Sequence, residues 1–177
     1  MLIKPYVAIM VTTHPYFNLD AFANPSTDLI WNHTLHLPYA KRNLAADDGA
    51  LPTGEIITIP VNSSDDFWSA PHQLGFATGR PDFTGHCGGA CTGYNGEWLL
   101  DNVPSPDSVV AQLASPWSGI TADFRTNQAG IVIYTCYWMD GSILIKSDQG
   151  RKGGDGNVKS SGCVAIEAHD WVDGINQ

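Results

Sequence analysis

Alternation of apolar and other side chains with a period of two is the pattern that most constrains how this chain folds. Residues 120–124 carry an apolar side chain at every second position, and residues 131–137 place Ile, Ile, Thr and Tyr on one face in the same way. This period is typical of β-strands, whose successive side chains point to opposite faces of a sheet. The sequence Asn-Gln-Ala-Gly at 127–130 lies between the two stretches and favours a turn. Both stretches are therefore predicted to be strands.

Other runs of strand length support the same fold class. They cover residues 6–11, 55–61, 142–146 and 163–166. Glycine and proline are frequent, at 18 and 11 residues, while only 15% of the residues are charged. This composition favours short strands joined by many turns. We therefore expect an all-β architecture, with residues 1–177 in one domain.

Two stretches fit more than one kind of element. Residues 109–113 could form a strand, or a helix that begins at the Ser-Pro pair of 105–106. Residues 41–50 could hold one helical turn before the Pro-Thr-Gly turn signal of 52–54.

The charge balance restricts the class of partner. The chain has 9 Lys and Arg residues against 18 Asp and Glu residues, so its formal net charge is −9. Such a charge repels nucleic acid and anionic membrane surfaces, and no apolar run approaches the roughly 18 residues that span a bilayer. A neutral polar small molecule is more compatible with this charge as a ligand. The oligomeric state and the compartment stay open, although residues 32–34 and 62–64 would be glycan acceptors in a secreted protein.

The four cysteines do not indicate a metal centre. Cys87 and Cys91 lie in a Gly-rich loop and could close a small disulfide ring. A zinc site of His86, Cys87 and Cys91 with Cys136 or Cys163 has poor ligand spacing. A disulfide or buried thiols are favoured.

Two segments far apart in the sequence hold a candidate acid and a candidate base. In Thr-Thr-His-Pro-Tyr-Phe-Asn-Leu at 12–19, His14 follows an apolar run, and its ordinary pKa allows it to give and regain a proton near neutrality. In residues 161–176, Glu167 follows an apolar strand and precedes a polar bend. Apolar neighbours such as Ile166 and Trp171 would desolvate that carboxylate and raise its pKa toward the range of a general base.

These segments resemble the aldose 1-epimerase, or galactose mutarotase, family, in which a His-x-Tyr-Phe-Asn-Leu element is followed far downstream by a Glu and an Asp-x-x-Asn bend. Further stretches match in the same order, and residues 93–98 and 115–119 resemble the fungal-type branch. The resemblance implies a galactose mutarotase-like β-sandwich, or supersandwich. It also implies an incomplete sandwich, truncated at both ends, because family members begin upstream of this sequence and continue beyond it. The matching residues are 14–19, 51–56, 66–67, 118–119, 134–135, and Glu167 with Asp173 and Asn176.

The family's reaction interconverts the α and β anomers of free aldoses such as galactose or glucose by opening the sugar ring. This reaction implies neither a metal nor an organic cofactor. By resemblance, His14 takes the position of the acid and Glu167 that of the base, and the two are expected to face each other across the sugar. A retaining or inverting glycosidase that uses Glu167 is less favoured, because no second carboxylate has a matching motif. The main alternative is a non-catalytic carbohydrate-binding remnant of a mutarotase.

The expected substrate-binding residues are Asn95, Glu97 and Trp98. Asn95 stands where the family has an aspartate that holds sugar hydroxyls, so an amide replaces a charge there. Glu97 or Asp101 could compensate for that charge. Val132 replaces a family glutamine and cannot make its contact. Trp98 could stack on the sugar, although aromatic side chains in a β-sandwich more often belong to the core.

Overall fold

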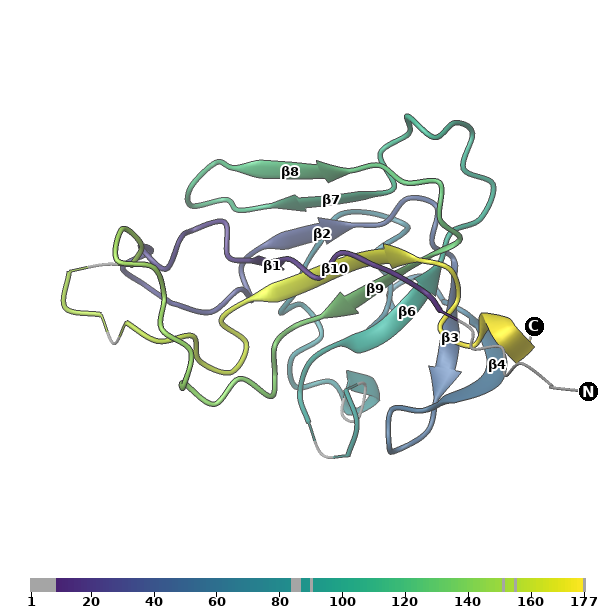
Figure 1. The fold of residues 1–177 in the computed structure, drawn as a ribbon, viewed down its shortest axis with the longest axis horizontal. Helices are drawn as coiled ribbons and strands as arrows, with labels where there is room; N and C mark the ends of the chain where they lie inside the picture. Colours follow the sequence, from purple (N-terminus) through teal and green to yellow (C-terminus); the bar gives the residue numbers. More distant parts are fainter. Residues whose placement is uncertain (1–8, 84–86, 90, 151, 155, 177) are drawn as a thin grey trace, which may run out of the picture.

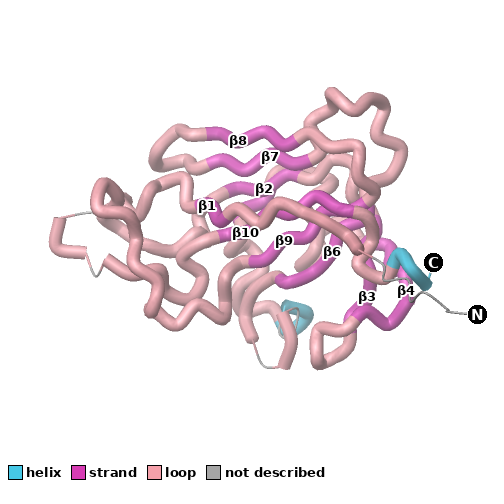
Figure 2. The backbone as a smooth tube through the Cα atoms, in the orientation of Figure 1, coloured by secondary structure: helices cyan, strands magenta, loops and turns pink. Residues whose placement is uncertain are grey.

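The regular secondary structure of the protein is almost entirely antiparallel β-strand, arranged in two sheets, as a computed structural model shows (Figure 1). It describes residues 9–83, 87–89, 91–150, 152–154 and 156–176. Within these ranges the helical segments are two short 3-10 turns (Figure 2), and no helix is long and apolar enough to cross a membrane. The prediction of an all-β fold is confirmed.

The larger sheet has six strands and the smaller sheet has four. The order in the larger sheet is β1-β10-β9-β6-β3-β4, and the order in the smaller is β5-β2-β7-β8. One core cluster takes buried side chains from both sheets, including Leu35, Leu113, Ile131 and Ile133. The elements are β1 (Tyr16–Phe17), β2 (Thr34–His36), β3 (Arg42–Ala46), β4 (Pro52–Thr58), β5 (His72–Gln73), η1 (Pro81–Phe83), β6 (Asn95–Leu99), β7 (Ala111–Ala114), β8 (Thr121–Phe124), β9 (Gly130–Tyr134), β10 (Val164–His169) and η2 (Gly174–Asn176).

The strongest alternating patterns form strands near the predicted positions, but in different sheets. β8 pairs with β7 in the smaller sheet, whereas β9 lies between β6 and β10 in the larger one. Residues 127–129 bend the chain between them, so the predicted turn connects two sheets. Ile131 and Ile133 of β9 are fully buried in the core, as the alternation predicts.

Other strand predictions are confirmed with shifted ends. The stretch at 163–166 forms β10, which continues to His169, and the stretch at 55–61 forms β4, which begins at Pro52 and ends at Thr58. The ambiguous stretch at 109–113 contributes to β7, a strand.

Three local expectations differ from the structure. The helical turn in 41–50 is wrong, because Arg42–Ala46 is strand β3 and pairs with both β4 and β6. The strand at 142–146 is also wrong: Leu144 makes one isolated bridge to Asn157 and is 77% exposed, so the run lacks a core to pack on. Of the run at 6–11, residues 6–8 lie outside the described part, and residues 9–11 form no strand.

Two disulfides take up all four cysteines. Cys87 is bonded to Cys91, and Cys136 is bonded to Cys163. The second disulfide joins the segment after β9 to the residue before β10, and so links two neighbouring strands of the larger sheet. The cysteines are therefore not available as zinc ligands, and His86 lies outside the described residues.

Candidate active site

The register of three central strands places two glutamates in one row of the larger sheet. Val132 of β9 is paired with Glu97 of β6 on one side and with Glu167 of β10 on the other. Because side chains alternate along a strand, Asn95 and His169 lie on the same face as these glutamates. The side chains of Trp98, Ile131 and Ile166 belong to the opposite, core-facing set.

A cavity of about 350 Å³ lies over this polar face, between β3, the start of β4 and the segment after β10. Its volume falls within the range of roughly 300–1,000 Å³ that is usual for small-molecule sites. The polar side chains that line it are Asn95, Glu97, Glu167 and His169. Apolar side chains complete the lining, including Leu44, Ala46, Val132 and Val172.

His14 and Glu167 are brought together from the two ends of the sequence. His14 Nε2 lies 3.0 Å from Glu167 Oε1, and the His14 side chain is 45% exposed whereas that of Glu167 is 11% exposed. The two groups were expected to face each other across a sugar, but here they contact each other directly. The pair therefore joins a nearly buried carboxylate to an imidazole that remains open to solvent.

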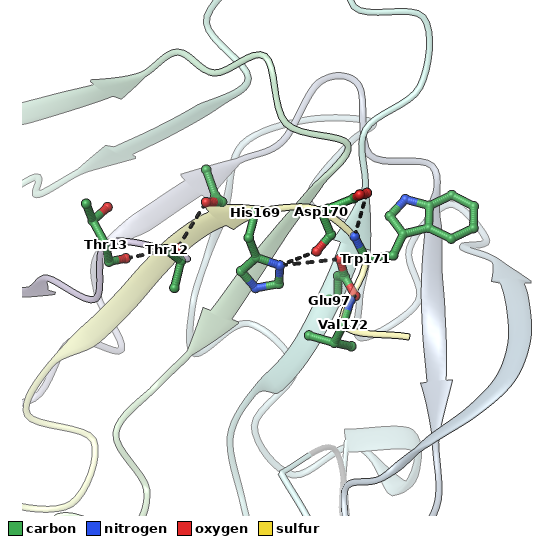
Figure 3. A network of polar contacts seen from close by, with 8 residues as sticks. Thr12, Thr13, Glu97, His169, Asp170, Trp171 and Val172 are labelled. Atoms are coloured by element: carbon green, nitrogen blue, oxygen red, sulfur yellow. Dashed lines mark hydrogen bonds and ion pairs between the residues drawn. The ribbon is translucent and has the colours of Figure 1, made fainter. Parts of the chain in front are cut away.

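Neighbouring contacts hold His14 at this position. Its ring lies against Tyr16 with 4.7 Å between ring centroids. The hydroxyl of Thr12 donates a hydrogen bond to the carbonyl oxygen of Ala168 at 3.0 Å, which ties the segment before β1 to β10 (Figure 3). Burial raises the pKa of Tyr16, and the nearby Tyr134 and Glu167 raise it further.

Glu97 and His169 form a second acid–imidazole pair, which is buried. Glu97 Oε1 lies 3.9 Å from His169 Nδ1, and Glu97 Oε2 accepts a hydrogen bond from the backbone N–H of Val172 at 2.9 Å (Figure 3). Burial raises the pKa of Glu97 and outweighs the lowering by the Val172 hydrogen bond and by His169. The charged form of this carboxyl group is therefore less favourable than that of an exposed glutamate.

The structure separates the expected substrate-binding residues. Asn95 and Glu97 line the cavity, but Trp98 is only 2% exposed, packs against Phe67 and donates its indole N–H to the carbonyl oxygen of Asp65. Trp98 therefore belongs to the core. Asp101 is bound by Arg42 through two hydrogen bonds, of 2.8 and 2.5 Å, and does not line the cavity.

His169 is the cavity residue that motif reasoning missed. It belongs to none of the motifs that single out His14 and Glu167, so the motifs predict no role for it. The strand period provides the missing signal, because a residue two positions after Glu167 on a continuing strand shares its face. That inference required β10 to extend beyond residue 166.

In the described part of the chain, no group of three or more His, Cys, Asp or Glu side chains is arranged to hold a metal ion.

Comparison with known proteins agrees with this fold. A sequence model of the aldose 1-epimerase family matches residues 6–176. The chain therefore belongs to the aldose 1-epimerase family.

Individual relatives give the extent of the match. A probable aldose 1-epimerase of Arthroderma benhamiae is 32% identical over 95% of this chain, and Epimerase FSL3 of Gibberella zeae is 29% identical over 95%. The chain spans 42% of the length of each of these relatives. A solved GalM/aldose epimerase homologue from C. elegans shares the fold, with a TM-score of 0.66 and 22% identity over 91% of this chain and 42% of that one.

Proposed function

We propose that this chain carries the proton-transfer site of an aldose 1-epimerase, which interconverts the α and β anomers of a neutral aldose such as galactose or glucose. The observation that carries the proposal is the 3.0 Å approach of His14 Nε2 to Glu167 Oε1 beside the cavity. Family membership supports the reaction class.

The proposed reaction needs two proton transfers at the sugar. Glu167 takes the proton of the anomeric hydroxyl while His14 gives a proton to the ring oxygen, so the C1–O5 bond breaks and C1 becomes an aldehyde. After rotation about the C1–C2 bond, His14 takes back the proton from the O5 hydroxyl as O5 attacks C1 from the other face. Glu167 returns its proton to the new anomeric oxygen. Only protons move between protein and sugar, so one acid and one base meet the chemical demand.

The surroundings suit the two roles. The Glu167 carboxylate is largely removed from water and lines the cavity, where a sugar hydroxyl could reach it. His14 remains exposed enough to exchange its proton with solvent between turnovers. Asn95 lines the same cavity, and its amide can both donate to and accept from sugar hydroxyls.

Polarimetry on a freshly dissolved single anomer of glucose or galactose tests the proposal. We expect the wild-type protein to accelerate mutarotation, and Glu167→Gln and His14→Ala to lower kcat/KM by about 100-fold or more each, as is usual for a general acid or base. Asp123→Asn is the matched control, because it makes the same carboxylate-to-amide change on an exposed position of β8. Wild-type protein no faster than buffer would contradict the proposal, and sugar binding without acceleration would favour the non-catalytic alternative.

A further inference from the structure

One ring nitrogen of His169 is engaged within the protein, and the side chain lines the cavity. Nδ1 donates a hydrogen bond to the carbonyl oxygen of Asp170 and lies 3.9 Å from Glu97 Oε1 (Figure 3). Nε2 has no hydrogen-bond partner among the described residues, and the side chain lines the cavity. The Asp170 contact places the proton of the neutral ring on Nδ1. Nε2 is therefore an acceptor in the neutral ring and a donor in the imidazolium.

Glu97 is placed to support a charged His169. Its carboxyl group is buried, and Oε1 has no hydrogen-bond partner among the described residues. Burying a carboxyl group in this way is unfavourable unless a cation or a proton compensates. The His169 imidazole lies within reach and could supply such a cation in its protonated form.

Gly130 makes room for this arrangement. A Cβ atom at position 130 would lie 2.1 Å from Glu97 Oε1 and 3.1 Å from its carboxyl carbon. Any side chain larger than hydrogen would push the carboxyl group away from its place between Val172 and His169. Gly130 is paired with His169 in the sheet, so the space lies directly beside the imidazole.

We propose that His169 is a further substrate-contacting residue of this site, whose Nε2 donates a hydrogen bond to an oxygen of a neutral aldose, with Glu97 as the positioning residue behind it. The inference rests on the proposed function for its ligand. It assigns the site two acid–imidazole pairs: His14 with Glu167 for proton transfer, and His169 with Glu97 for binding and orientation. Asp170 and Glu167 are the other acidic groups near the second pair.

Histidine NMR tests the contact independently of catalysis. In ¹⁵N-labelled protein titrated with glucose or galactose, we expect the His169 Nε2 resonance to shift, and to shift more than Nδ1, which stays bound to Asp170. His169→Ala identifies the resonance, and His36 serves as an internal reference because its strand, β2, lies in the other sheet. An unmoved Nε2 resonance at saturating sugar would overturn the proposal.

Kinetics separates a binding role from a structural one. We expect His169→Gln, which can bond to a hydroxyl but cannot become a cation, to lower kcat/KM by about 10- to 100-fold, in line with the loss of a charged hydrogen bond. Glu97→Gln should keep the Val172 contact and change the pH dependence of kcat/KM. Unchanged kcat/KM in His169→Gln, or a pH profile in Glu97→Gln that overlays the wild type, would contradict the inference. If the wild-type protein neither accelerates mutarotation nor shows a sugar-dependent Nε2 shift, the proposed function fails together with it.

Discussion

At the scale of single residues, the Glu97 carboxyl group occupies the space that a side chain at position 130 would need. We therefore expect substitutions of Gly130 and Glu97 to affect stability in a coupled way. We expect Gly130→Ala to destabilise the protein by about 1–3 kcal/mol, the usual cost of overpacking, because the new methyl group would overlap the Glu97 carboxyl group. Denaturant unfolding measures the effect. In a Glu97→Ala background the same change should cost less, since the overlapping atoms are gone, and equal costs in both backgrounds would show that the two residues are not coupled.

The titration of Glu97 gives a second prediction at this scale. Its pKa in the folded protein lies above the ordinary value of 4.5, mainly because of burial. At pH values between 4.5 and the higher pKa of the folded protein, Glu97 is protonated in the folded state but has lost its proton in the unfolded state. The wild-type protein therefore loses stability as the pH rises through this range. Glu97→Gln cannot titrate. Its free energy of unfolding, measured by urea titration, should therefore rise relative to the wild type as the pH rises above about 4.5. A difference that is constant with pH would contradict the raised pKa.

The sequence predicted part of the candidate site at the level of residues. His14 and Glu167 stand in motifs that could be recognised in one dimension, and the structure brings them together, although their roles stay a proposal. The burial of Trp98 depends on which face of β6 meets the core, and sequence reasoning left both possibilities open. The Glu97–His169 pair depends on register across β9, which no local pattern specifies.

At the scale of elements, the Cys136–Cys163 disulfide stabilises the position of β10 against β9. The bond closes a loop with a sequence separation of 27, for which the chain-entropy relation gives about 3–4 kcal/mol. We expect the double change Cys136→Ser and Cys163→Ser to lower the free energy of unfolding by about this amount. The corresponding Cys87→Ser and Cys91→Ser protein should lose less, because its separation is only 4. Equal losses would contradict the loop-length argument.

Prediction of strands from the sequence succeeded where buried and less buried side chains alternate regularly. It failed where pairing with neighbouring strands determines the conformation. The side chains of β9 alternate between the core and the cavity, so the alternation in its sequence correctly predicts a strand. β3 has a mixed sequence that suited a helical turn, but hydrogen bonds to two neighbouring strands fix it as a strand. The run at 142–146 is apolar enough for a strand yet has no sheet to join, which a local pattern cannot reveal.

At the scale of the whole molecule, net charge favours uncharged ligands. The chain carries a formal charge of −9, and among the described residues the cavity lining holds two glutamates and neither Lys nor Arg. We expect kcat/KM for glucuronate, which carries a carboxylate, to be roughly fivefold or more below that for glucose, which corresponds to about 1 kcal/mol of repulsion. Added salt should narrow the difference by screening. Equal rates at low ionic strength would contradict this view of selectivity.

In the proposed function, His14 and Glu167 act on one sugar as a single proton-transfer unit. The most direct measurement is a double-mutant cycle of mutarotation rates with His14→Ala, Glu167→Gln and the combined variant. Because each group depends on its partner to complete the ring opening, the combined variant should be no more than about tenfold slower than the slower single variant. Losses that multiply in the combined variant would show that the two residues act separately and would contradict a single proton-transfer unit.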